Sequence, residues 1–337
     1  MYKKNRGLLS VMLMTITLVV GLMLTSVTAQ DIDPLPSWSD GPTKSAILQF
    51  VKDVTETGGP KYVRPEERIA TFDNDGTLWC EQPVVQAVFA LDGVKKQADK
   101  HPEWREQQPF KAAIEGDKAY LEQDYHKGGK GLMQIIAVTH TGMTQKAFAD
   151  SVKDFFKSAR HPKFNVPYTA VAYQPMVELL DYLRANGFKT YICSGGGIHF
   201  MRVISEEAYG IVPENVIGSH GKAAFELRDG KWAIVKKPEI GLINDRAGKP
   251  VGIDLHIGRK PILAAGNVRS GGDIAMLAYC QSNKRPSLQL LINHDDAERE
   301  FAYREKDNAS LNAARKHGWV VVSMKRDWKR MFSFDKE

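Results

Sequence analysis

Short apolar runs alternate with stretches of helical spacing over much of the chain. Strands are predicted where an apolar run is bounded by turn residues, at 68–73, 188–193, from 216 onward, 261–265, 287–292 and 319–324, with a β-hairpin over 223–235. Helices are predicted where apolar positions recur every three or four residues, at 43–54, 175–186, 196–209 and 273–280. This alternation indicates an α/β fold with a Rossmann-like, doubly wound parallel sheet.

Residues 83–168 interrupt the alternation. Runs such as 84–94 and 146–156 have helical spacing, and Thr144 stands at a capping position before the second run. The pattern predicts a helical insert after the first strand. Within it, the polar segment 139–142 is predicted to be a solvated loop, with a position facing the substrate as the alternative.

The first 29 residues have the pattern of an export signal. Lys3, Lys4 and Arg6 precede an uncharged apolar run, and Val27-Thr28-Ala29 offers a small-residue cleavage pattern. We expect export, in a bacterium to the periplasm, because polar Thr and Ser residues in the run weaken a stable membrane span. The alternative is an uncleaved anchor that faces outside the cytoplasm, since the run approaches the length of a bilayer span.

Composition and charge narrow the class of protein. Among 337 residues, 43% are hydrophobic and 26% are charged, which is ordinary for a globular chain. The first 29 residues hold three Lys and Arg and no acid, so the net charge of +6 leaves an excess of three in the remainder, too weak to indicate a nucleic-acid partner. The three cysteines form no disulfide framework, and Cys193 is expected to be a buried thiol.

Asp73 and Asp75 leave the end of the first predicted strand. Burying two unpaired carboxylates is costly, and Mg²⁺, which prefers hard oxygen ligands, removes the difficulty. A carboxylate can also attack phosphorus, while a second carboxylate protonates the leaving oxygen and later deprotonates water. The alternative is an Asp-Gly turn that happens to contain a second Asp.

Ser194, Gly195 and Gly196 follow the strand predicted at 188–193. A hydroxyl group and unhindered N–H groups at the start of a helix favour phosphate oxygens, although Gly-rich turns are common without this role. Further along, Lys249 lies in a predicted loop, where a lysine is usually a solvated surface residue. A phosphoenzyme nevertheless needs a cation to offset the charges of nucleophile and phosphate.

Asn267 and Asp273 belong to the turn after the strand predicted at 261–265. An amide oxygen and a carboxylate at neighbouring strand ends can complete a magnesium site. For Asp273 the alternative is a helix N-cap, and both roles are compatible.

These four motifs, in this order, resemble the haloacid dehalogenase superfamily of phosphohydrolases, and within it the phosphoserine phosphatase-like branch. The resemblance spans 68–296 and implies a catalytic core of 30–82 and 169–337 with residues 83–168 as a helical cap. It implies that Asp73 is the nucleophile and Asp75 the acid/base group, with catalytic support from Ser194 and Lys249. The implied phosphate-binding residues are Thr77, Ser194, Gly195, Gly196 and Lys249, and the implied Mg²⁺ ligands are Asp73, Asp75, Asn267 and Asp273.

The last motif departs from the family pattern. It is longer than the usual turn, and Asn267 stands where many relatives carry Asp. The direct ligand is therefore Asn267, Asp273 or a water bridged by Asp273. The dehalogenase branch lacks the second catalytic Asp, so Asp75 argues against dehalogenase chemistry.

Two further polar positions lie near the motifs. His294, Asp295 and Asp296 follow a predicted strand, and they either border the site or, as we favour, order the neighbouring loop together with Arg299. Glu81 lies just past the catalytic loop, but its offset does not support the substrate-amine role of a glutamate in phosphoserine phosphatases.

The sequence thus predicts an exported, Mg²⁺-dependent phosphatase that hydrolyses a small phosphomonoester through an aspartyl phosphate on Asp73. The expected partner is a small phosphorylated molecule, with no nucleic acid, and with membrane contact only through an uncleaved signal. The alternatives are a phosphotransferase or pyrophosphatase that uses the same site, or a non-catalytic protein that binds a phosphorylated ligand.

Overall fold

The computed structural model describes residues 33–127, 129–269 and 271–335. The predicted export signal at 1–29 lies outside the described residues. Across the three described ranges, no helix is both long and apolar enough to cross a membrane.

One sheet of seven strands, in the order β4-β3-β2-β1-β5-β6-β7, organises the fold. The strands are β1 (Ile69–Phe72), β2 (Lys189–Gly197), β3 (Val216–Arg228), β4 (Lys231–Leu242), β5 (Leu263–Asn267), β6 (Leu288–Asn293) and β7 (Val320–Ser323). Neighbouring strands are parallel except β3 and β4, which form the predicted antiparallel hairpin. The predicted α/β fold class is confirmed.

Helices cover both faces of the sheet, as the apolar strands require. In β5, Leu263 and Ala265 belong to one hydrophobic core, and Ala264 between them belongs to a second core on the opposite face. Helices α1 (Pro42–Thr55) and α7 (Gln174–Ala185) supply side chains to the first core. The second core is completed by α10 (Gly248–Ile257), α11 (Ile274–Gln281) and α12 (Ala309–His317). The short α13 (Met324–Asp327) follows β7.

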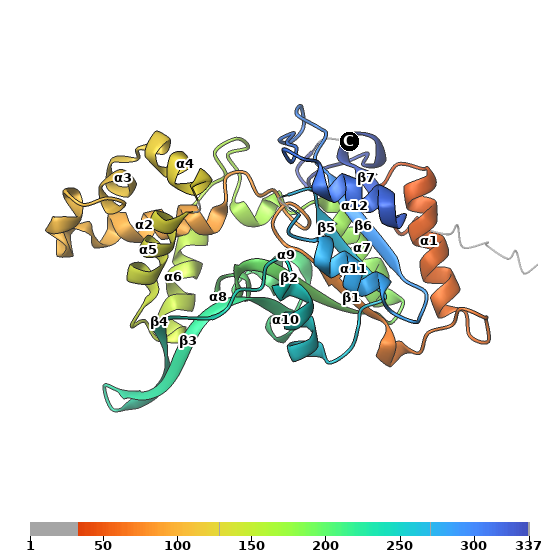
Figure 1. Cartoon of the computed structure of the whole chain (residues 1–337), viewed down its shortest axis with the longest axis horizontal. Helices are drawn as coiled ribbons and strands as arrows, with labels where there is room; N and C mark the ends of the chain where they lie inside the picture. Colours follow the sequence, from red (N-terminus) through yellow and green to blue (C-terminus); the bar gives the residue numbers. More distant parts are fainter. Residues whose placement is uncertain (1–32, 128, 270, 336–337) are drawn as a thin grey trace, which may run out of the picture. The chain divides into compact units, whose positions relative to one another are not determined.

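Among the described residues of the predicted insert at 83–168, five α-helices follow one another, and α7 comes after them and before β2 (Figure 1). They are α2 (Val85–Gln97), α3 (Phe110–Glu115), α4 (Lys118–His126), α5 (Lys130–His140) and α6 (Gln145–Ser158). Thr144 is the N-cap of α6, as predicted, and its hydroxyl accepts the N–H of Ala147 at 3.1 Å. Part of the insert has a hydrophobic cluster of its own, which includes Val94, Trp104 and Ile135. These helices therefore hold together partly through their own packing.

The segment after β2 differs from the prediction. A single helix was expected at 196–209, whereas β2 continues to Gly197, which pairs with Ser219 of β3 after a shift of register. Two short helices, α8 (Ile198–Met201) and α9 (Ser205–Tyr209), then follow. Pairing with a strand that is distant in sequence thus outweighs the local tendency of the glycines to open a helix.

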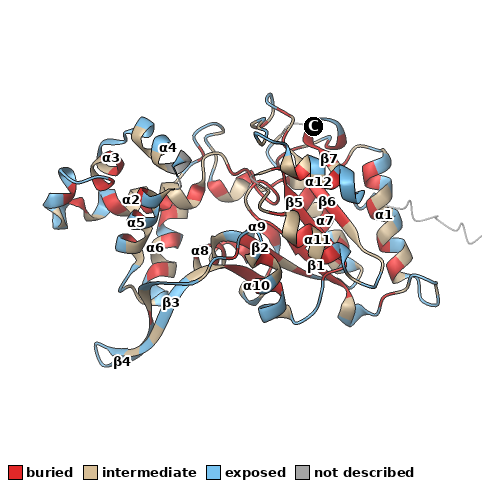
Figure 2. Ribbon diagram, in the orientation of Figure 1, coloured by how far each residue is buried: buried red, intermediate tan, exposed pale blue. Residues whose placement is uncertain are grey.

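The hairpin of β3 and β4 is longer than the predicted 223–235 and keeps its turn at Asp229-Gly230. Figure 2 shows that much of its outer part is exposed, whereas β1 and β5 are buried. The predicted active-site residues lie at the buried strands and not on this hairpin.

Candidate active site

The carboxyl ends of three adjacent strands carry the predicted motifs. Phe72, the last residue of β1, pairs with Ile192 of β2 on one side and Ala265 of β5 on the other. Asp73 follows Phe72 directly, Ser194 lies two residues after Ile192, and Asn267 lies two residues after Ala265. The parallel register therefore brings together motifs that are more than a hundred residues apart in the sequence.

Lys249 joins two of the acidic residues. Its Nζ donates to Asp73 Oδ1 at 2.7 Å and also forms an ion pair with Asp273 Oδ1. Although a solvated loop was the usual expectation, Lys249 lies in the first turn of α10 and is only 2% exposed. Burial alone would lower the pKa of its ammonium group, but Asp273 and Asp73 outweigh burial and raise that pKa, so Lys249 carries its charge.

Asp73 is buried, although 10% of its side chain remains exposed. Its backbone N–H donates to Ala265 of β5 at 2.9 Å, which fixes the start of the loop. Burial, together with the neighbouring carboxylate of Asp273, raises the pKa of Asp73 well above its usual range, against the opposing effect of Lys249. A carboxylate held in this way needs further positive charge to remain ionised.

Asp75 is oriented by the ring of Trp79, whose Nε1–H donates to Asp75 Oδ1 at 2.7 Å. The other oxygen, Oδ2, lies 3.4 Å from the position that a Cβ atom on Gly196 would take. Burial raises the pKa of Asp75 although the bond from Trp79 lowers it. A raised pKa favours the protonated form, which a general acid requires.

The loop at the end of β2 is arranged around Ser194, which is fully buried. The N–H of Gly196 donates to Ser194 Oγ at 3.1 Å, and the carbonyl of Ser194 accepts from Asn244 Nδ2 at 2.9 Å. Asn244 was missed from the sequence, because an asparagine between β4 and α10 belongs to no motif. It supports the loop from the segment that also carries Lys249.

Thr77, predicted to bind phosphate, lies on the catalytic loop with its side chain fully buried. Its backbone N–H donates to the carbonyl of Asn74 at 3.2 Å, which closes the turn. Its hydroxyl has no hydrogen-bond partner in the described part of the chain. A buried hydroxyl without a partner can still donate to a ligand.

The contacts of Asp273 link the last motif to Lys249. Its Oδ2 accepts the backbone N–H of Asn267 at 2.8 Å, while Oδ1 is held by Lys249. Asp273 stands at the N-cap position of α11 but makes no side-chain capping bond there. Both carboxylate oxygens are thus used to orient Lys249 and Asn267.

Three oxygen atoms face the side-chain amide of Asn267. Its Nδ2 lies 3.1 Å from the carbonyl of Asp75, 3.3 Å from Glu81 Oε1 and 3.3 Å from Tyr303 Oη. A Cβ atom on Gly76, whose φ is 74°, would collide with this amide. Only glycine fits this position, because both the space and the backbone conformation exclude a side chain.

Glu81 is 2% exposed and is a member of the site that sequence reasoning noticed but did not assign. Its carboxylate forms an ion pair with Arg269 and accepts a hydrogen bond from Tyr303. Burial raises the pKa of Glu81, and Arg269 opposes this effect. Tyr303 gave no signal in the sequence, since it lies beyond the last motif in a segment without regular structure.

The donor set suits a hard divalent cation. Asp73 supplies carboxylate oxygen, Asp75 a main-chain carbonyl, and Asn267 an amide group that can present oxygen instead of nitrogen. The buried cluster of Asp73, Asp75, Glu81 and Asp273 has four carboxylates against the two cations Lys249 and Arg269. Even with Asp75 protonated, the carboxylates outnumber the cations, and a divalent cation would offset this excess of negative charge. In the described ranges no group of three or more His, Cys, Asp and Glu side chains forms a metal site, so main-chain and amide oxygens would have to contribute.

The residues after β6 divide into two roles. Asp296 accepts from Arg299 Nε at 2.6 Å and from the Arg299 backbone, as expected for loop ordering. His294 instead borders the site, since its Nε2 lies 2.7 Å from the carbonyl of Gly76 and its Nδ1 lies 3.2 Å from Glu300. It supports the catalytic loop from behind.

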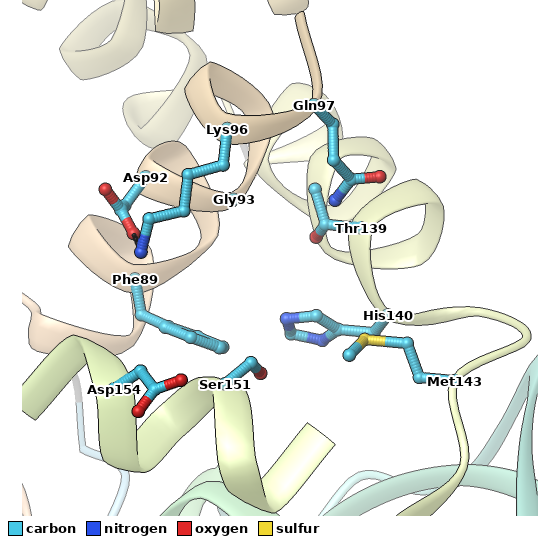
Figure 3. A pocket seen from close by; sticks show the side chains of 10 residues that line it. All are labelled: Phe89, Asp92, Gly93, Lys96, Gln97, Thr139, His140, Met143, Ser151 and Asp154. Atoms are coloured by element: carbon cyan, nitrogen blue, oxygen red, sulfur yellow. Dashed lines mark ion pairs between the residues drawn. The ribbon is translucent and has the colours of Figure 1, made fainter. Parts of the chain in front are cut away.

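A separate cavity of about 360 Å³ lies among the helices of the insert, and it includes none of the predicted site residues (Figure 3). The segment 139–142 is not wholly a loop, because Thr139 and His140 end α5. The His140 ring lies near Phe89 in the view, with ring centroids 5.7 Å apart. Lys96 and Asp92 form an ion pair of 2.6 Å on the cavity wall.

Comparison with known proteins agrees with this geometry. The haloacid dehalogenase-like hydrolase family matches residues 70–254, which is more than half of the chain. No curated protein matches the chain significantly.

Solved structures are similar to this chain at low sequence identity. A conserved protein of unknown function from Anaerococcus prevotii is 17% identical with a TM-score of 0.52, over 83% of this chain and 91% of that one. A protein of unknown function from Bordetella pertussis is 16% identical with a TM-score of 0.47, over 76% and 98%. A phosphoserine phosphohydrolase-like protein from Francisella tularensis is 16% identical with a TM-score of 0.39, over 76% and 94%.

The family match includes Asp73, Asp75, Ser194 and Lys249, which the fold gathers at one edge of the sheet. The resemblance seen in the sequence is therefore confirmed, and the chain belongs to the haloacid dehalogenase-like hydrolase family.

Proposed function

We propose that this protein is a Mg²⁺-dependent phosphatase that hydrolyses a small phosphomonoester through an aspartyl phosphate on Asp73. The observation that carries the proposal is the buried Lys249, which holds Asp73 at 2.7 Å and pairs with Asp273 on the other side. A nucleophilic carboxylate beside a fixed cation, at the carboxyl end of a parallel sheet, suits attack on a phosphoryl group.

In the first step, a carboxylate oxygen of Asp73 forms a bond to phosphorus while the bond from phosphorus to the leaving oxygen breaks. Asp75 gives its proton to that oxygen, which its raised pKa favours. In the second step, Asp75 takes a proton from water, the water oxygen attacks phosphorus, and the bond to Asp73 breaks. Free phosphate leaves and both carboxylates return to their starting states.

Ser194, the amides of its loop and Thr77 bind the phosphoryl oxygens in this proposal. Lys249 keeps the charge of Asp73 balanced before and after phosphorylation. Asp73, the carbonyl of Asp75 and Asn267 would hold Mg²⁺, which would supply additional positive charge, while Asp273 orients Asn267 through its backbone N–H.

The test is a phosphate-release screen of the purified protein against a panel of phosphomonoesters, with Mg²⁺ and with a chelator. We expect release that depends on Mg²⁺ and disappears in Asp73→Asn, which also controls for contaminating phosphatases. Product analysis with a competing alcohol separates hydrolysis from phosphotransfer. Absence of release from every substrate would favour the non-catalytic phospho-ligand-binding alternative.

Export to the periplasm is part of the proposal and rests on the pattern of residues 1–29. Cell fractionation with N-terminal sequencing of the mature protein tests it. A mature chain that begins near residue 30 in the periplasmic fraction is expected, and an intact N-terminus in the membrane fraction would favour the anchored alternative.

A further inference from the structure

One side chain from the helical insert reaches the phosphate-binding loop. Gln86 lies in the first turn of α2, and its Oε1 accepts the backbone N–H of Gly197 at 2.8 Å. This bond fixes which end of the amide is oxygen, because a nitrogen in the same place would set two donors against each other. The Nε2 group of Gln86 must therefore lie on the other side of the amide, away from the Gly197 N–H.

The Nε2 atom of Gln86 is buried and has no hydrogen-bond partner among the described residues. Native proteins rarely leave a buried donor without an acceptor, so this group calls for a partner that binds. The described loops of the insert supply none, although Oε1 on the same amide accepts a hydrogen bond. The side chain is held in place at one end and available at the other.

This donor lies close to the phosphate-binding loop and to the proposed acid/base residue. A Cβ atom on Gly196 would collide with Gln86 Nε2 and would lie 3.4 Å from Asp75 Oδ2. Gln86 Nε2 and the acid/base oxygen of Asp75 therefore both lie close to the space above the Cα atom of Gly196. Because glutamine is uncharged, it adds a donor next to Asp75 without adding a charge.

We propose that Gln86 contacts the substrate, and that its Nε2 donates a hydrogen bond to an oxygen of the phosphoryl group while its Oε1 holds the Gly197 amide. The assignment rests on the proposed phosphatase function, since it concerns the same active site. It makes the insert part of the phosphate site, because occupation of the site by a phosphoryl oxygen satisfies a donor that α2 carries. Sequence reasoning missed Gln86, because a glutamine at the start of a helix belongs to no motif.

The experiment measures binding of inorganic phosphate in the presence of Mg²⁺ by calorimetry, together with kcat/KM for two phosphomonoesters that differ only in the leaving group. The informative variant is Gln86→Glu, which keeps an acceptor for Gly197 but replaces the donor with an acceptor. Gln86→Met removes both groups. The matched control is Gln97→Glu, the same change at the last residue of α2, on the wall of the cap cavity.

We expect both Gln86 variants to bind phosphate about 10- to 100-fold more weakly and to lose a similar factor in kcat/KM for both substrates, as for loss of a hydrogen bond to a charged acceptor. Gln97→Glu should bind phosphate like the wild type. Thermal midpoints and circular dichroism identify a variant that fails to fold. If Gln86→Met is unfolded, the test rests on Gln86→Glu.

Wild-type phosphate affinity in a folded Gln86→Glu would overturn the inference. So would a loss of kcat/KM that depends on the leaving group while phosphate binding is unchanged, since that result would place the donor on the leaving group. Failure of the proposed function is seen separately, as absence of turnover in the wild type. Phosphate binding still decides the role of Gln86 in that case.

Discussion

The candidate active site at the strand ends and the cavity in the insert differ in the state of their buried polar side chains. In the active site, Lys249 pairs with Asp73, which directly follows β1, and with Asp273 in the turn after β5. Its charge is therefore compensated by segments that are distant in the sequence. In the cavity, His140 has no partner for its Nε2 among the described residues, and burial lowers its pKa to about 4. The candidate active site thus stabilises an ionised side chain, whereas burial in the cavity keeps His140 neutral.

This difference teaches where chemistry can occur. Phosphoryl transfer needs ionised groups that are held in a preorganised arrangement, and the candidate active site provides them in Lys249 and its two carboxylates. The cavity is lined by residues of α2, α5 and α6 and by Met143, and the ion pair of Lys96 with Asp92 on its wall joins two residues of the same helix (Figure 3). A neutral histidine in an aromatic setting contributes packing and not charge.

The largest effect on activity is expected for a substitution of the proposed acid/base residue in the active site. Asp75→Asn removes both the proton donor for the leaving group and the base for water, so kcat should fall by about 10²- to 10⁴-fold. With an activated leaving group the first step is less affected, and the enzyme should accumulate as the phosphorylated form. Intact mass spectrometry after rapid quenching measures the added phosphoryl group.

The control for this change is Asp295→Asn, which alters a carboxylate that bonds to Ser323 and lies outside the predicted site. It should keep the wild-type kcat. Wild-type turnover in Asp75→Asn would remove the acid/base assignment and with it the chemical contrast between the two regions.

A second substitution tests how much the stability of the protein depends on charge compensation in the active site. Lys249→Met leaves Asp73 and Asp273 buried without their shared cation, and we expect the free energy of unfolding to fall by about 3–5 kcal/mol. Urea unfolding followed by circular dichroism measures the loss. Lys237→Met is the control, because its ion pair with Glu226 is partly exposed and should be worth less than about 1 kcal/mol. Equal losses in the two variants would show that burial does not distinguish the pairs.

The contribution of His140 in the cavity to stability should depend on pH. His140 has a pKa of about 4 when folded against an ordinary value of 6.5, so the unfolded chain binds the proton first. The stability due to its neutral burial is present above about pH 6.5 and is lost as the pH falls toward about 4, by up to about 3 kcal/mol.

The variant His140→Phe removes this titration and keeps an aromatic ring beside Phe89. Its unfolding free energy should depend less on pH between about 7 and about 4 than that of the wild type, measured as urea midpoints at both values. An unchanged pH dependence would mean that His140 is not the group that makes the cavity sensitive to acid.

The smallest effect concerns local structure in the insert. Thr144→Ala removes the capping bond to Ala147 and should cost about 1 kcal/mol in the stability of the insert. Hydrogen exchange of the α6 amides measures it, and Thr141→Ala, at an exposed threonine after α5, serves as the control. If exchange in the core strands rises as much as in α6, the insert and the core unfold together.

Much of the fold could be read from the order of the residues. The apolar runs that became β1, β5, β6 and β7 were located within a few residues, because strands that are buried on both faces must be apolar throughout. The prediction of one helix at 196–209 was wrong. Gly197 pairs with Ser219 of β3, and the local sequence around Gly197 does not show this pairing. The loop position of Lys249 was wrong for a similar reason, since α10 gains stability by packing its buried Ile253 under β3.

By itself, the sequence determined the class of fold, the Asp73 and Asp75 pair at a strand end, and the family, because these depend on local spacing and on the order of motifs. Only the tertiary structure decided that Asp273 orients Asn267 and Lys249, that Glu81 joins Tyr303 and Arg269, and that Gln86 of the insert reaches the loop at Gly196. These contacts join residues from separate elements. Their geometry depends on how helices and strands pack, and no local pattern of residues records it.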